Sequence, residues 1–264
     1  MTTTSPTQQS NWQTAMTWVK ECVTTIRKQP FKWLSVALAY LMIFLLLPAK
    51  LPVVISYVLA LFYPTFLVLA VGLYREEDAG RTTSLTTLIH QVKPALKSLL
   101  LLGMVCVAYS FVVAYFTEAD SVALKVLIDT KAEPKLILSQ ALPLILKALV
   151  FLLPLMMATW FAPMLIAFQG LNVVQAIKSS IAGSIQGMVT MGLSWLIITV
   201  GMVLLMITVG VVFAIVSIAL PTVGVFLTPV FLIISFLFAT ALMLAFQYVT
   251  YRDICRDVSD EIKL

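Results

Sequence analysis

Long apolar runs alternate with short polar segments along almost the whole chain. Six of these runs approach or exceed the roughly 20 helical residues that cross a bilayer core of about 30 Å. We therefore expect an all-α polytopic membrane protein with six transmembrane helices. The predicted spans cover about residues 32–48, 52–74, 98–116, 148–168, 188–210 and 228–250.

The fifth run is longer than one bilayer crossing requires. Apolar character continues from Met188 to Leu220, which corresponds to about 50 Å of helix. Such a helix tilts strongly, breaks near Gly210 or projects beyond the membrane, and the pattern leaves these alternatives open. Pro221 and Gly224 are expected to form the turn into the sixth span.

A short amphipathic stretch precedes each odd-numbered span. Its apolar residues recur at steps of three and four, which is typical of a helix lying in the membrane interface. The alternative is that these stripes pack against the helix bundle. Ser84 and Asn172 are the expected N-caps of the second and third stretch. The stripes are Trp12, Met16, Val19, Val23 and Ile26; Leu85, Leu88, Ile89, Val92 and Leu96; and Val173, Val174, Ile177, Ile181 and Ile185.

Each amphipathic stretch, with the two spans that follow it, forms one predicted helix-hairpin unit. The three units, about 11–74, 82–169 and 171–251, together make a single membrane domain. Residues 1–10 are expected to be a flexible tail and 252–264 a cytoplasmic tail. The first apolar run begins too late for a cleavable signal peptide, so we expect an uncleaved signal anchor.

The basic residues predict the orientation of the chain. Six spans place both termini on one side of the membrane, and that side carries most of the 17 Lys and Arg residues. Because basic loops stay in the cytoplasm, both termini are expected there. The segment 117–135 has a near-neutral charge balance and is expected to be the main periplasmic loop.

Composition excludes several classes of protein. Hydrophobic residues make up 61% of the chain, charged residues only 11%, and the mean hydropathy is +1.03. A soluble globule, a disordered chain and a disulfide scaffold are therefore excluded. The net charge of +5 is better explained by orientation and lipid headgroups than by nucleic acid, which is not an expected partner.

Signatures of enzymes and cofactors are missing from the sequence. His90 is the only histidine, and Cys22, Cys106 and Cys255 form no CxxC pair, so no metal or cofactor is expected. Ser194 follows Gly192-Leu in a span but has no base nearby, and we expect no catalytic residue and no enzyme. Lys147 is placed at the outer interface, which leaves the spans without ionisable groups for ion-coupled transport.

Basic residues at the cytoplasmic ends of the helices are the candidate lipid-binding groups. Arginine and lysine there suit phosphate headgroups, so anionic phospholipid is the expected partner. Two return spans close with the same Tyr-Arg pair. Acidic neighbours such as Glu76 and Asp253 pair with these cations in the alternative interpretation. The candidates are Arg75, Arg81, Lys93, Lys97, Arg252 and Arg256.

Small residues spaced along the later helices predict close helix packing. The pattern leaves open whether the helices meet within the chain or across a homo-oligomer. An envelope protein is the other candidate partner. The packing residues are Ser179, Gly183, Gly187, Gly192, Gly201 and Gly210.

Four stretches together resemble a family of bacterial inner-membrane proteins, the YciC-like group. They are Trp12 to Leu34, Arg81-Thr-Thr-Ser-Leu85, Ala162 to Ser180, and Tyr248-Val-Thr-Tyr-Arg-Asp-Ile254. The resemblance implies an all-helical inner-membrane protein and brings no catalytic residues. The Thr/Gln-rich start and the length are also similar to an Acinetobacter inner-membrane protein, which implies a part in keeping the cell envelope intact.

These observations favour a non-enzymatic inner-membrane protein that maintains the envelope by lipid binding or lipid handling. The first alternative is a transporter or channel for a small or amphiphilic molecule, and the second is a scaffold for a partner complex. Polar residues lining one cavity would favour the transporter. The candidates for such a lining are Gln186, Ser194, Thr199, Thr208, Ser217, Ser235, Thr240 and Gln247.

Overall fold

Helices account for every regular element that the structure, a computed structural model, contains in its described residues. This confirms the all-α fold class. The chain divides into two compact units, and α3 (Val53–Asp78) contributes residues to both of them. The described residues are 10–48, 50–81, 83–219 and 221–261, with side chains except at 53, 216–228 and 256–261.

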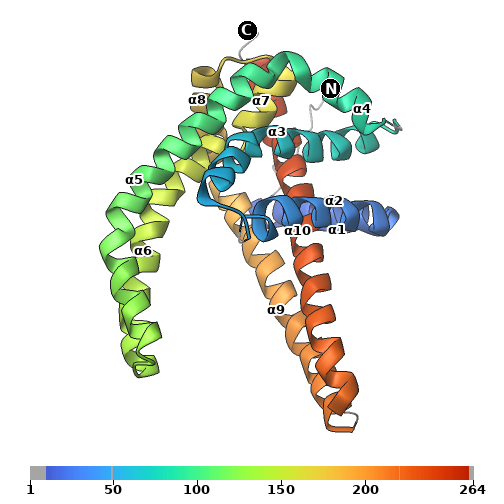
Figure 1. The fold of residues 1–264 in the computed structure, drawn as a ribbon. Helices are drawn as coiled ribbons and strands as arrows, with labels where there is room; N and C mark the ends of the chain where they lie inside the picture. The colour runs from blue at the N-terminus through green and yellow to red at the C-terminus, as the bar shows by residue number, and fades with distance from the viewer. Residues whose placement is uncertain (1–9, 49, 82, 220, 262–264) are drawn as a thin grey trace. The chain divides into compact units, whose positions relative to one another are not determined.

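The first unit brings together helices from both ends of the chain. α9 and α10 run side by side as a hairpin, and α1 packs across both of them (Figure 1). α2 also contacts α10 and continues into a π-helical turn. The bounds are Asn11–Lys28 for α1, Pro30–Leu41 for α2, Met42–Leu46 for the π-helical turn, Met188–Ala219 for α9 and Pro221–Glu261 for α10.

A sharp bend separates α1 from α2. The two helices make an angle of 102°, with Gln29 between them at φ −140° and ψ 66°. Pro30 disfavours helical geometry at the residue before it and is itself well suited to the first position of a new helix. The sequence Gln29-Pro30 therefore ends the amphipathic helix and redirects the chain into the first apolar run.

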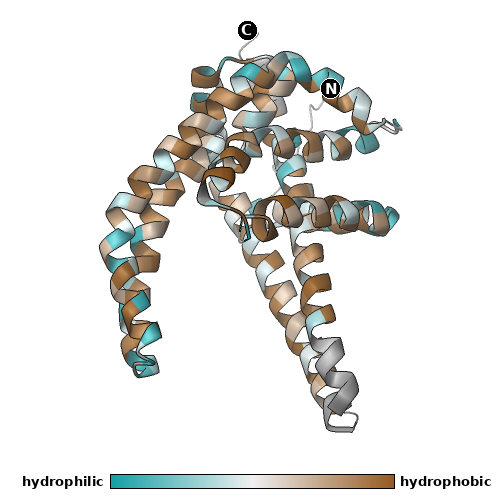
Figure 2. Ribbon diagram, in the orientation of Figure 1, coloured by the Kyte–Doolittle hydropathy of each residue, from teal (hydrophilic) through white to brown (hydrophobic). Residues whose placement is uncertain are grey.

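The second unit is built around a long helical hairpin of α5 and α6, drawn in green in Figure 1. Polar residues gather at the far end of this hairpin (Figure 2). α4 leads into α5 through one 3-10 turn, and α7 contacts both α5 and α6. The bounds are Leu85–Val92 for α4, Lys93–Ala95 for the turn, Leu96–Asp129 for α5, Pro134–Thr159 for α6, Ala162–Gln169 for α7 and Val173–Gln186 for α8.

The predicted fourth span is interrupted between α6 and α7. Pro163 has no N–H and cannot continue the hydrogen-bond ladder, so the helix stops at Thr159 and restarts at Ala162. Ser180 repairs the break, because its hydroxyl donates to the Met157 carbonyl at 2.7 Å and accepts from the Phe161 N–H at 3.0 Å. This explains why a serine faces inward from α8.

Five helical segments are long and apolar enough to cross a membrane, or six if α1 with α2 and its π-helical turn counts as one bent span. The chain is therefore a multi-pass membrane protein. Large apolar side chains lie on the outside of these helices, as expected where the surroundings are hydrocarbon. The side of the membrane on which the termini lie stays a prediction.

The predicted periplasmic loop at 117–135 is wrong. α5 continues to Asp129 and α6 begins at Pro134, so the connection is only four residues long. Most of the charges that indicated a loop lie on the two helices instead, with only Lys131 and Glu133 in the connection, and Lys147 pairs with Asp120 at 2.9 Å. Without Gly or Pro between Leu96 and Asp129 except Gly103, nothing in this stretch terminates the helix.

The long fifth run forms one uninterrupted helix. α9 passes through Gly210 without a break and ends at Ala219, so of the three alternatives the break near Gly210 is wrong. α10 begins at Pro221, which places Gly224 inside that helix rather than in a turn. A continuous helix of this length, about 48 Å, must tilt or project beyond a 30 Å core.

The three predicted amphipathic helices are present as α1, α4 and α8, and Ser84 and Asn172 cap two of them as predicted. The predicted stripes are partly wrong about which residues of these helices are buried. α8 buries Ala176, Ser180 and Gly183, while Val174 and Ile185 point outward. In α1 the buried residues are Ala15, Trp18, Cys22 and Ile26, one position away from most of the predicted stripe.

Candidate functional site

A polar cleft in the first unit gathers charged and hydroxyl side chains from three helices. Its volume is about 430 Å³, and its walls come from α1, the end of α3 and α10. Tyr74 and Tyr248 mark the point at which α3 and α10 change from apolar to charged sequence. The lining residues are Thr17, Lys20, Glu21, Thr24, Thr25, Lys28, Tyr74, Glu77, Asp78, Tyr248, Val249 and Arg252.

Local sequence signals position the α1 wall. Ser10 and Gln13 form a capping box that fixes the start of the helix. From there Thr17, Glu21, Thr24 and Lys28 follow at steps of four, three and four, so they share one helix face. The opposite side of α1 is buried against α9 and α10, which turns this polar stripe toward the cleft.

The α3 wall is the charged end of a long apolar helix. α3 ends in Arg75-Glu-Glu-Asp78, and Gly80, at φ +67°, turns the chain away from it. The Tyr74 hydroxyl donates to the Ala241 carbonyl at 3.0 Å, which ties α3 to α10 just inside the cleft. Lys32 of α2 forms an ion pair with Glu77 at the same end.

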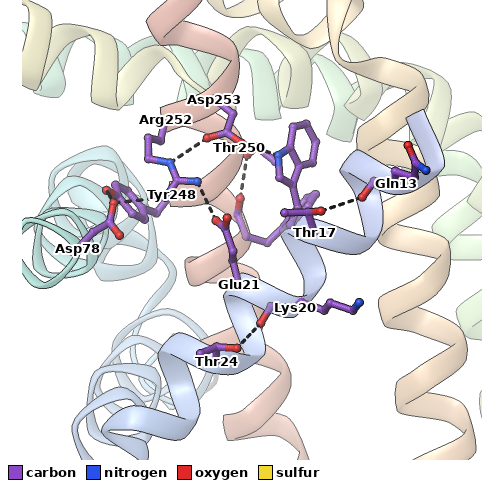
Figure 3. Close-up of polar contacts among 12 residues, drawn as sticks. Gln13, Thr17, Lys20, Glu21, Thr24, Asp78, Tyr248, Thr250, Arg252 and Asp253 are labelled. Atoms are coloured by element: carbon purple, nitrogen blue, oxygen red, sulfur yellow. Dashed lines mark hydrogen bonds and ion pairs between the residues drawn. The ribbon is translucent and has the colours of Figure 1, made fainter. Parts of the chain in front are cut away.

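Arg252 of α10 is the centre of the polar contacts (Figure 3). Its Nη2 donates to Glu21 at 2.7 Å, its Nη1 to Asp78 at 3.3 Å and its Nε to Asp253 at 2.8 Å. The guanidinium therefore joins carboxylates from α1, α3 and α10. A planar fork with five N–H donors is suited to such a junction, and a lysine ammonium is not.

Two aromatic side chains extend this network. The Tyr248 hydroxyl donates to Asp78 at 2.7 Å (Figure 3). The Trp18 indole N–H donates to Asp253 at 2.7 Å. Trp18 and Trp195 both pack edge-on against Phe246, with ring centroids 6.3 Å and 5.9 Å apart. The hydrogen bonds of Trp18 and Tyr248, together with the packing of Trp18 against Phe246, therefore hold the network in place.

Arg81 forms an ion pair with Glu76, as the alternative interpretation of these cations predicted. Its Nε and Nη2 donate to the two oxygens of Glu76 at 2.8 and 3.0 Å, and Thr83 donates to the same carboxylate at 2.8 Å. The hydrogen bonds from Arg81 to Glu76 and the charge of Glu76 raise the pKa of Arg81 above its ordinary value. Because Glu76 is buried, Arg81 neutralises a charge that would otherwise be costly.

The six predicted headgroup residues are distributed over both units. Arg252 lines the polar cleft, and Arg75 lies exposed on α3. Lys93 and Lys97 are exposed in the second unit, and the side chain of Arg256 lies outside the described residues. The contact of these cations with anionic lipid stays a prediction.

Several cleft residues were missed as a site by sequence reasoning. Lys20, Glu21 and Thr24 were recognised only as polar residues between the apolar positions of α1, and Lys28 only as a basic residue on the cytoplasmic side. Asp78 was recognised only as an acidic neighbour that pairs with the arginines in the alternative interpretation. The spacing of Thr17, Glu21, Thr24 and Lys28 on one face was the available signal. The pairing of Glu21 with a residue 231 positions away had no signal in a single sequence.

An apolar groove lies between α9 and α10 in the same unit. Its volume is about 420 Å³, and its walls include Trp195, Met202, Met206, Met243 and Phe246. Thr199 is the one residue of the predicted cavity lining that the groove contains among the described side chains. The other predicted residues with described side chains line neither cavity. The side chain of Ser217 lies outside the described residues.

The predicted packing residues have different surroundings. Gly183 and Gly187 are buried and Ser179 is half-buried. A Cβ built at Gly192, Gly201 or Gly210 would meet no atom of the described chain within 4 Å. The close approach that the prediction missed is at Gly103, where a Cβ would overlap the backbone of Leu61.

The remaining candidate groups show no catalytic arrangement on the described surface. The Ser194 hydroxyl donates to the Thr190 carbonyl in its own helix at 2.8 Å, and His90 is exposed on α4. The three cysteines are free thiols. Within the described ranges, no group of three or more His, Cys, Asp or Glu residues is placed to hold a metal ion.

Comparison with known proteins adds no relative to this description: no protein-family model, curated protein or solved structure matches the chain.

Proposed function

We propose that this protein is a non-enzymatic lipid-binding protein of the bacterial inner membrane that helps to maintain the cell envelope. The observation that carries the proposal is the polar cleft at the ends of α3 and α10. It lies where both helices change from apolar to charged residues, which is the depth of lipid headgroups. The envelope role rests on the similarity of the Thr/Gln-rich start and the length to an inner-membrane protein that implies this role.

The size and walls of the polar cleft suit a headgroup. About 430 Å³ is within the range of small-ligand sites, and hydroxyl and charged groups converge on it. α1 supports this assignment, because Trp12, Met16 and Val19 extend the apolar surface of an amphipathic helix beside the cleft. The acyl chains of a bound lipid would remain in the surrounding hydrocarbon.

The transporter alternative receives no support from the apolar groove. A path for a polar molecule needs several polar side chains along one cavity, and the groove contributes only Thr199 from the predicted set. The scaffold alternative would be supported by a defined partner that co-purifies in stoichiometric amount.

Native mass spectrometry of the purified protein tests the proposal. The wild type is delipidated in mild detergent and titrated with phospholipid, and we expect discrete lipid-bound peaks. Thr25→Trp fills the polar cleft and should reduce the bound fraction several-fold. Thr86→Trp on exposed α4 is the matched control and should leave it unchanged. Equal lipid binding by both variants would contradict the assignment of the site.

A further inference from the structure

The charges of the polar cleft are balanced, which bears on the kind of lipid that it can hold. Three basic and three acidic side chains line it: Lys20, Lys28 and Arg252, and Glu21, Glu77 and Asp78. A site selective for an anion would carry a surplus of donors. This cleft offers both signs of charge within one small volume.

Internal pairing removes the strongest anion ligand. Arg252 donates to three carboxylates, those of Glu21, Asp78 and Asp253, so its donors are directed at protein atoms. A phosphate approaching Arg252 would have to displace at least one of them and leave that carboxylate without its cation. The sequence-based hypothesis that Arg252 holds an anionic headgroup is therefore disfavoured by the geometry.

Groups of both signs remain available after this pairing. Neither Lys20 nor Lys28 takes part in an ion pair with any described side chain, and both are exposed. Glu21 and Asp78 bond to Arg252 through one oxygen each, and their side chains remain 39% and 47% exposed. Each carboxylate therefore keeps a second oxygen for a further donor.

The two kinds of group are spaced along α1. Glu21 and Lys28 lie on the same helix face two turns apart, about 10 Å along the axis. Thr24, labelled in Figure 3, lies between them in the sequence and also lines the cleft. A ligand with a cationic end and an anionic group could contact both. An anionic headgroup without an amine could use only the lysines and would face the carboxylates.

We propose that the polar cleft recognises a phosphoethanolamine-type zwitterion, with the ammonium on Glu21 and Asp78 and the phosphate beside Lys20 and Lys28. This inference rests on the proposed function and names the lipid class that the site takes. A primary ammonium has three N–H donors for carboxylate oxygens, and a trimethylated ammonium has none.

A lipid competition separates the alternatives. The protein is reconstituted in nanodiscs and probed by native mass spectrometry with phosphatidylethanolamine, phosphatidylcholine and phosphatidylglycerol. Soluble phosphoethanolamine is a fourth arm that reports whether the ligand comes from the membrane. We expect phosphatidylethanolamine to bind roughly tenfold more tightly than either other lipid, the factor given by one or two lost charge-assisted hydrogen bonds.

Two variants assign the contacts, and a third is the control. Lys20→Gln with Lys28→Gln should weaken phosphatidylethanolamine binding roughly tenfold. Glu21→Gln keeps an acceptor for Arg252 but loses its charge, so it should abolish the preference over phosphatidylglycerol. Lys125→Gln with Lys135→Gln removes the same charge from exposed positions that neither line the cleft nor belong to the predicted headgroup set, and should leave phosphatidylethanolamine binding unchanged.

The outcomes are distinguishable. Phosphatidylglycerol binding as tightly as phosphatidylethanolamine would overturn the zwitterion assignment while leaving a lipid-binding protein. Soluble phosphoethanolamine binding as tightly as the lipid would overturn the membrane as the source of the ligand. The absence of bound lipid of every class would overturn the proposed function itself.

Discussion

Trp33 stacks face to face on Tyr74, with ring centroids 3.7 Å apart and an interplanar angle of 11°. The pair joins the start of α2 to the end of α3, and both side chains are buried. The Trp33 indole N–H also donates to the Thr25 carbonyl at 3.1 Å, across the bend between α1 and α2. Trp33 therefore connects the bend between α1 and α2 to the end of α3, through two residues that line the polar cleft.

Replacing Trp33 by Ala should destabilise the protein by about 3 kcal/mol, because it opens a large cavity and removes a buried hydrogen bond. Trp12→Ala is the matched control, since Trp12 lies on the neighbouring α1 and is 53% exposed. Thermal unfolding in detergent, followed by circular dichroism, measures both variants. Equal shifts in Tm would show that Trp33 is not part of the packed core.

Replacing Arg252 by Gln should act mainly on stability. The change leaves Glu21, Asp78 and Asp253 without their shared cation, which costs about 1–2 kcal/mol for such partly exposed ion pairs. Arg252→Lys should recover only part of the loss, because an ammonium cannot reproduce the planar fork. Thermal unfolding in detergent compares both variants with the wild type.

The sequence-based hypothesis predicts a different result for Arg252→Gln, with normal stability and reduced anionic lipid. Co-purifying phospholipid is therefore quantified on the same samples. Arg75→Gln serves as the comparison, since Arg75 carries the same Tyr-Arg context on α3 but does not line the polar cleft. A stable Arg252→Gln protein that has lost its anionic lipid would favour the original hypothesis.

The architecture of the fold was largely predictable because it depends on local patterns. Apolar runs of bilayer length predict the spans. Ser84 and Asn172 predict helix starts, because a side-chain cap depends on only a few neighbouring residues. The extent of α5 and α6 was missed because the charges at 117–135 resembled a loop. Charged residues are not costly on a helix where it extends beyond the hydrocarbon core, so their presence does not indicate that the helix has ended.

The site was less predictable because its contacts are tertiary. Arg252 was recognised as a candidate, but its hydrogen bond to Glu21 depends on how α1 packs across α10. That packing cannot be read from a single sequence. The inward face of α8 was misjudged for a related reason. Ser180 faces inward to satisfy backbone groups freed by the break at Pro163, and that break belongs to another helix.

Limited proteolysis should locate the true end of the α5–α6 hairpin. Lys131 lies in the four-residue connection with a left-handed φ of 51°, whereas Lys125 lies inside α5. Trypsin requires an extended segment, so cleavage after Lys131 should be much faster than cleavage after Lys125. Mass spectrometry of the fragments measures both rates. If the termini are cytoplasmic, the same cut should occur in spheroplasts and not in inside-out vesicles.

Comparable rates of cleavage at Lys125 and Lys131 would restore the longer loop predicted from sequence. Lys131→Gly is a useful companion variant, because glycine adopts positive φ without strain. It should stabilise the connection slightly while removing the cleavage site. A second substitution, Lys125→Gly, should instead destabilise α5 by about 1 kcal/mol, as glycine does inside a helix.

Two glycine substitutions separate packing within the chain from packing between chains. A Cβ at Gly103 would overlap the carbonyl oxygen of Leu61, so Gly103→Ala forces α3 and α5 apart and should cost about 1–3 kcal/mol. The same substitution at Gly201 meets open space in the described chain. Because alanine is the better helix former, Gly201→Ala should be neutral or stabilising by up to about 1 kcal/mol.

The result at Gly201 also decides the role of the glycines along α9. Gly192 and Gly201 lie nine residues apart, which is two and a half helical turns, and so fall on opposite sides of an ideal helix. A single dimer face on a straight helix therefore does not contain both, and substitution of one should leave any association through the other intact. Thermal unfolding and mass photometry in detergent are measured for Gly103→Ala, Gly201→Ala and the wild type. Loss of an oligomer on Gly201→Ala, with unchanged monomer stability, would show that this glycine packs against a second copy; destabilisation of a monomer by Gly201→Ala would contradict the open surroundings seen around it.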